Sequence, residues 1–150
     1  MNPRGLAVAV FALAACNKLT IEGTIQKVRV YAVDETTSAV VADYRITNTA
    51  RLPLVVREVM VEIEDKDGKT TAGRTIADTD ASRFLDANPE QGPKHNASLL
   101  PREKLSAGQS VDRMVAASFD SKEDEVNARR KLRVKIVDVD GPIVVLDGSK

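Results

Sequence analysis

The sequence has few of the residues on which disulfides, metal centres and stacking surfaces depend. Its 150 residues include one cysteine, one histidine and no tryptophan, with only 2 tyrosines and 3 phenylalanines. A single cysteine excludes an internal disulfide, so core packing alone must hold the domain together. A zinc site needs three or four nitrogen or sulfur ligands, more than one histidine and one cysteine supply. The scarcity of aromatic residues disfavours a stacking surface for nucleic-acid bases.

Neither an excess of charge nor a long apolar segment is present. The 22 basic and 22 acidic side chains cancel, whereas nucleic-acid-binding domains carry a marked basic excess. We therefore expect no nucleic-acid partner. The longest uncharged apolar run, residues 6–15, has ten residues, about half of what a membrane-spanning helix needs. The length fits one domain.

The first eighteen residues have the order of parts of a secretory signal peptide. Arg4 and the amino terminus precede the apolar run, which ends in small residues and Cys16. This order predicts a signal peptide over residues 1–15, a tether over 16–23 and a folded domain over 24–150. An inert buried thiol is the alternative for Cys16, but its place directly after the apolar run favours modification.

The four residues Leu13-Ala14-Ala15-Cys16 resemble the lipobox of bacterial lipoproteins. The resemblance implies cleavage before Cys16, which then carries a diacylglyceryl group and an amide-linked acyl chain such as palmitate. Two or more lipid chains anchor a protein stably, so the membrane itself is an expected partner. In many Gram-negative lipoproteins, an aspartate directly after the cysteine favours retention in the inner membrane. This chain has Asn17 at that position. The resemblance thus implies a periplasm-facing lipoprotein of the cell envelope and favours the outer membrane.

Beyond the tether, apolar and polar residues alternate in short segments. Alternation with period two is typical of half-buried strands, and Asp67-Gly68 is a strong signal for a hairpin turn. Several short strands separated by turns indicate an all-β antiparallel sandwich of about seven strands, with one or two short helices near residues 80–87 and 121–130. The expected strands are 24–34, 38–48, 54–64, 69–77, 111–119, 132–136 and 143–146.

Three turn motifs between residues 40 and 119 carry a second resemblance. Ile46-Thr47-Asn48-Thr49, Asp65-Lys66-Asp67-Gly68 and Leu105-Ser106-Ala107-Gly108-Gln109 resemble those of FxLYD-type and late-embryogenesis-abundant type-2 domains. The resemblance implies an immunoglobulin-like β-sandwich, and these domains share no catalytic residues. Residues 78–100 form an insertion relative to their pattern.

This insertion is the part of the chain most suited to binding. Long loops in compact domains are usually functional or disordered, and Phe84 and Leu85 are expected to pin the short helix to the sandwich. Its carboxylates could bind a hard cation or a small ligand. Alternatively, Asp78 or Asp80 caps the helix, and His95 occupies an exposed loop position. The candidate binding residues are Asp78, Asp80, Asp86 and His95.

One basic cluster stands near the C-terminus: Arg129, Arg130, Lys131, Arg133 and Lys135. It could contact anionic lipid headgroups. Alternatively, it combines a helix C-terminus, where cations are favoured, with the solvent-facing side of a strand.

No serine or cysteine stands beside a general base in an arrangement that would activate a nucleophile. The sequence therefore predicts a non-enzymatic envelope lipoprotein that acts as a protein-interaction or structural module, without a cofactor. The alternative is a periplasmic lipoprotein that binds a small ligand or cation through residues 78–100.

Overall fold

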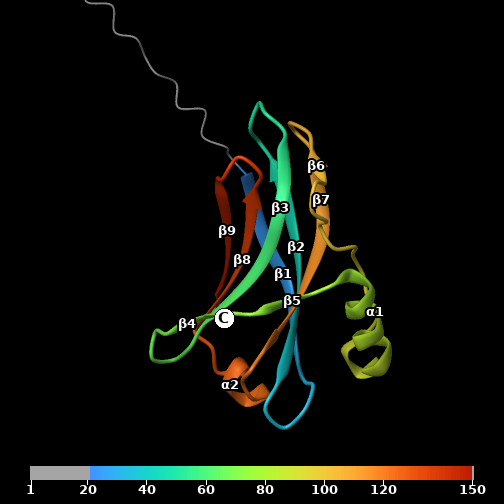
Figure 1. Ribbon diagram of the computed structural model, residues 1–150, viewed down its shortest axis with the longest axis vertical. Helices are drawn as coiled ribbons and strands as arrows, with labels where there is room; N and C mark the ends of the chain where they lie inside the picture. Colours follow the sequence, from blue (N-terminus) through green and yellow to red (C-terminus); the bar gives the residue numbers. More distant parts are fainter. Residues whose placement is uncertain (1–20, 150) are drawn as a thin grey trace, which may run out of the picture.

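The computed structural model describes residues 21–149, which form two antiparallel sheets packed face to face (Figure 1). The first sheet has the order β1-β2-β7-β5, with strands Ile21–Ala32, Ser38–Asn48, Ser110–Phe119 and Arg74–Ile76. The second has the order β4-β3-β8-β9, with strands Thr70–Ala72, Leu54–Glu64, Lys131–Asp138 and Ile143–Ser149. The short strand β6 (Lys104–Leu105) pairs with β3, and the helices are α1 (Asp78–Ala87), η1 (Pro89–Gln91) and α2 (Glu123–Asn127).

This architecture confirms the predicted all-β antiparallel sandwich. Strands β2 and β3 have the predicted bounds, and β1 begins at Ile21, before the predicted start at residue 24, because Ile21 pairs with Asn48. The predicted signal peptide, Cys16 and the first residues of the tether lie outside the described part of the chain. Among residues 21–149, no helix is long and apolar enough to cross a membrane.

The strand predicted over residues 69–77 is two strands in different sheets, which corrects the prediction. β4 pairs with β3, and β5 pairs with β7. The change of sheet occurs at Gly73, whose N–H donates to Val61 O at 2.8 Å. A Cβ at Gly73 would lie 2.6 Å from Phe119 Cζ, so only glycine lets the chain pass this close to the ring. The segment closes one side of the sandwich.

The main core lies between the sheets. It is formed by the apolar residues of the alternating pattern from which the strands were predicted. In β3, for example, Val59, Val61 and Ile63 point inward between half-buried or exposed neighbours. Tyr44, Phe119 and other large side chains from the first sheet pack against them. This burial of apolar surface supplies the driving force for the fold.

A second apolar cluster covers part of the outer face of the first sheet. Leu85 and Ala81 of α1 are buried there against Val41 and Met114, with α1 on the flank of β7 and β5 (Figure 1). The expectation that Phe84 and Leu85 pin this helix is confirmed, because Leu85 is buried in this cluster and the partly buried Phe84 packs against it. Because both faces of the sheet are covered here, β2 is buried continuously from Ser38 to Tyr44.

Candidate functional site

The four candidate residues of the insertion do not converge on one site. Asp78 accepts hydrogen bonds from Lys94 Nζ at 2.6 Å and from the Ser98 N–H at 2.8 Å, so it fastens the loop to the helix. Asp80 pairs with Arg83 at 3.2 Å.

The other two, Asp86 and His95, are exposed. The helix-cap alternative for Asp78 or Asp80 is also wrong, because Ala77 is the N-cap and no side chain caps the N-terminus of α1. Among residues 21–149, no group of three or more histidine, cysteine, aspartate or glutamate side chains could hold a metal ion.

A buried ion pair lies beneath the insertion, on the outer face of the first sheet. Arg29 Nη2 lies 3.1 Å from Asp43 Oδ2, and the two residues are only 4 % and 3 % exposed. Arg29 Nη1 also donates to the carbonyls of Gln91 and Pro93, and Asn96 donates to Asp43. Buried charges persist where they are paired and hydrogen-bonded. The pair therefore anchors the loop after α1 to β1 and β2.

The bonds from Lys94 and Ser98 hold the pKa of Asp78 at about 2, below its ordinary value of 3.8. A depressed carboxyl pKa contributes stability above pH 4 that is lost as the pH falls toward 2. Because the side chain is 33 % exposed, solvent screening reduces the contribution to about 1 kcal/mol. We expect Asp78→Asn to be less stable than wild type by this amount near pH 6 and equally stable near pH 2, as measured by urea unfolding.

Asp86→Asn is the matched control, because it removes an exposed carboxylate from the same helix. Its difference from wild type should stay within about 0.5 kcal/mol at both pH values. If the difference in the free energy of unfolding between Asp78→Asn and wild type did not change with pH, this account of Asp78 would be wrong.

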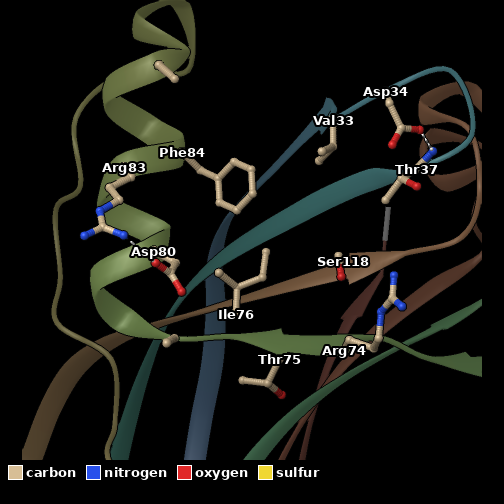
Figure 2. Close-up of a pocket in the computed structure, with 12 residues that line it drawn as sticks. Val33, Asp34, Thr37, Arg74, Thr75, Ile76, Asp80, Arg83, Phe84 and Ser118 are labelled. Atoms are coloured by element: carbon tan, nitrogen blue, oxygen red, sulfur yellow. Dashed lines mark hydrogen bonds and ion pairs between the residues drawn. The ribbon is translucent and has the colours of Figure 1, made fainter.

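A groove lies between α1 and the turn that joins β1 to β2 (Figure 2). Its volume is about 910 Å³, and it is open to solvent. Phe84 from α1 and Ile76 from β5 give it an apolar floor, and Val33, 42 % exposed, stands at the opposite wall. The sequence did not single out these residues for binding, because they come from separate segments. Asp80 is the only one of the four candidates that lines the groove.

Charged side chains of both signs stand at the rim of this groove. Arg74 pairs with Asp120 at 2.8 Å, and Arg83 pairs with Asp80, but the side chains of both pairs are 52–82 % exposed. Such exposed pairs contribute about 0–1 kcal/mol, so a partner could replace them at little cost. On the opposite wall, the N–H groups of Thr36 and Thr37 donate to Asp34 and lower its pKa.

The basic cluster near the C-terminus divides into two groups. Arg133 pairs with Glu64 and Asp147, and Lys135 pairs with Glu62, which confirms the strand-face interpretation for these two. Arg129, Arg130 and Lys131 instead line a separate small hollow with Lys27. Lys27 is distant in sequence, so nothing in the local pattern associates it with the cluster.

Comparison with known proteins gives no family and no activity. No family model matches the chain. No curated protein matches it either.

Among solved structures, an uncharacterised β-sandwich protein from Clostridium difficile 630 is similar at a TM-score of 0.42 and 12% identity, covering 85% of this chain and 84% of that one. A conserved hypothetical protein from Bacillus anthracis is similar at a TM-score of 0.42 and 12% identity, covering 77% of this chain and 81% of that one.

Proposed function

We propose that this protein is a lipid-anchored, non-enzymatic module of the cell envelope, with an immunoglobulin-like sandwich that binds a protein partner. The signal-peptide pattern and the lipobox-like residues before Cys16 support the location. The groove beside α1 supports the binding role, because it combines an apolar floor with exposed charges of both signs. Interfaces commonly have this arrangement of an apolar centre and a polar rim.

The buried ion pair adds support for a fixed binding surface. Arg29 and Asp43 hold the segment that follows α1, and Leu85 holds the helix itself. The wall of the groove is therefore part of a rigid scaffold, which lowers the entropic cost of ordering a binding surface. In this proposal, the partner inserts an apolar side chain over Ile76 and Phe84 and pairs with Arg74 or Arg83.

Site-specific photo-crosslinking in the producing cells tests the binding role. A photoreactive residue at Arg83 or Ala87, which line the groove, should give one discrete adduct with the same envelope protein. The matched control is Val145, which is 44% exposed on β9, outside the groove. The groove would be refuted as the binding surface if neither Arg83 nor Ala87 gave an adduct, or if the control position Val145 gave the same adduct.

Metabolic labelling with a lipid precursor tests the anchor separately. The wild-type chain should incorporate the lipid and sediment with membranes, whereas Cys16→Ala should do neither, because Cys16 is the residue that the lipobox resemblance assigns to the lipid. Equal labelling or equal sedimentation of the two proteins would refute the anchor without affecting the groove.

A further inference from the structure

A second hollow, separate from the groove, lies at the open side of the sandwich. Here β1 and β9, the free edges of the two sheets, face each other. They approach so closely that a Cβ at Gly148 would lie 3.1 Å from Ile25 Cδ1. Next to this contact, the residues that follow α2 help to enclose a cavity of about 220 Å³. Its apolar floor is formed by Ile25, Val28 and Leu132.

The charged residues that line this cavity are all cations: Lys27, Arg129, Arg130 and Lys131. The register of β1 shifts between Ile25 and Lys27, and bulges of this kind redirect side chains at sheet edges. None of the three acids of α2 lines this cavity, and two of them, Asp124 and Glu125, line a different hollow beside the β3–β4 turn. The cavity is therefore a local concentration of positive charge in a neutral protein.

Neither Arg129 nor Arg130 has a close carboxylate partner of its own. The side chain of Arg129 donates to the Val126 carbonyl at 3.1 Å, and no ion pair to it is found in the described chain. Its partial burial lowers its pKa, because removal from water disfavours the charged form. Arg130 lies 3.9 Å from Glu64, which Arg133 already binds at 2.8 Å. An incoming anion would supply the missing counter-charge.

We propose that this cavity binds a phosphate group, held by Lys27 of β1 and by Arg129, Arg130 and Lys131, which lead into β8. Guanidinium groups bind phosphate oxygens through two parallel hydrogen bonds, and lysine adds a point charge. The volume of about 220 Å³ is large enough for a phosphate group together with a small group attached to it. The group belongs either to a free phosphate or phosphomonoester or to an anionic phospholipid headgroup. The start of β1 lies at the opposite end of the sandwich from α2 (Figure 1).

Titration of the full-length protein in neutral detergent with inorganic phosphate at low ionic strength tests the site, with amide chemical shifts as the readout. We expect saturable shifts at Gln26 and Gly148, which line the cavity. Lys27→Gln and Arg130→Gln should each weaken binding at least tenfold, and both side chains are exposed enough for the fold to tolerate them. Lys104→Gln, which removes an exposed cation elsewhere, should change binding less than twofold.

A parallel titration with phosphatidylglycerol vesicles distinguishes the two sources. Saturation by inorganic phosphate assigns a free phosphate compound, and saturation by vesicles alone, with the same dependence on Lys27 and Arg130, assigns a lipid headgroup. Failure of both, or equal weakening by Lys104→Gln, would overturn the proposal. These outcomes leave the groove and its protein partner unaffected.

Discussion

Asp43→Ala should destabilise the protein by about 3–5 kcal/mol, the range measured when one member of a buried ion pair is removed. The variant leaves the guanidinium of Arg29 buried at 4 % exposure without its carboxylate. It also removes the acceptor for Asn96. Chemical unfolding of wild type and variant at neutral pH measures the loss.

Asp112→Ala is the matched control, because Asp112 also pairs with an arginine of a neighbouring strand, Arg45, at 2.8 Å. Here the side chains are 38 % and 55 % exposed, so solvent screens the pair and the expected loss is much smaller than for Asp43→Ala. The double variant Arg29→Met/Asp43→Leu should recover much of the stability, because it removes both charges together. If Asp43→Ala costs no more than Asp112→Ala, the buried pair does not anchor the insertion.

Gly73→Ala should cost about 1–3 kcal/mol, as expected when a methyl group is forced into a filled core. The new Cβ would lie 2.6 Å from Phe119 Cζ and 2.9 Å from Ala117 Cβ. The segment cannot move away easily, because the Gly73 N–H is bonded to Val61 O. Thermal unfolding of the two proteins gives the difference.

A double-mutant cycle identifies the cause. In the background of Phe119→Leu, where the ring is absent, Gly73→Ala should be clearly less costly than in wild type. Ala72→Ser, at the exposed neighbouring position, should change stability by no more than about 0.5 kcal/mol. Equal costs of Gly73→Ala in both backgrounds would show that the contact with Phe119 does not explain the need for glycine.

The strands could be predicted because each follows a local rule. The alternation in β3 assigns Val59, Val61 and Ile63 to the core without any knowledge of their partners. Asp67-Gly68 likewise marks the hairpin turn, with Gly68 at a φ of 84°. The position of Leu85 one turn after Ala81 is sufficient to place one face of α1 against the sheet.

The candidate binding residues were less predictable, because sequence proximity is a poor guide to which side chains meet. Asp78 and His95 belong to one insertion, yet the first is occupied by Lys94 and the second is exposed. Conversely, Lys27 and Arg129 meet at the cavity from opposite ends of the chain. The packing of β1 against both β9 and α2 brings them to the same hollow.

The sequence by itself determined the antiparallel strands, their inward faces and the turns between them, since these depend on neighbours within a few residues. The tertiary structure decided the rest. The segment predicted as one strand over residues 69–77 is divided at Gly73 into β4 and β5, because it must close the side of the sandwich against Phe119. The tertiary structure also buried Arg29 and Asp43, whose alternation indicates a polar strand face, because the insertion folds back over that face and supplies the carbonyls and amide that bind them.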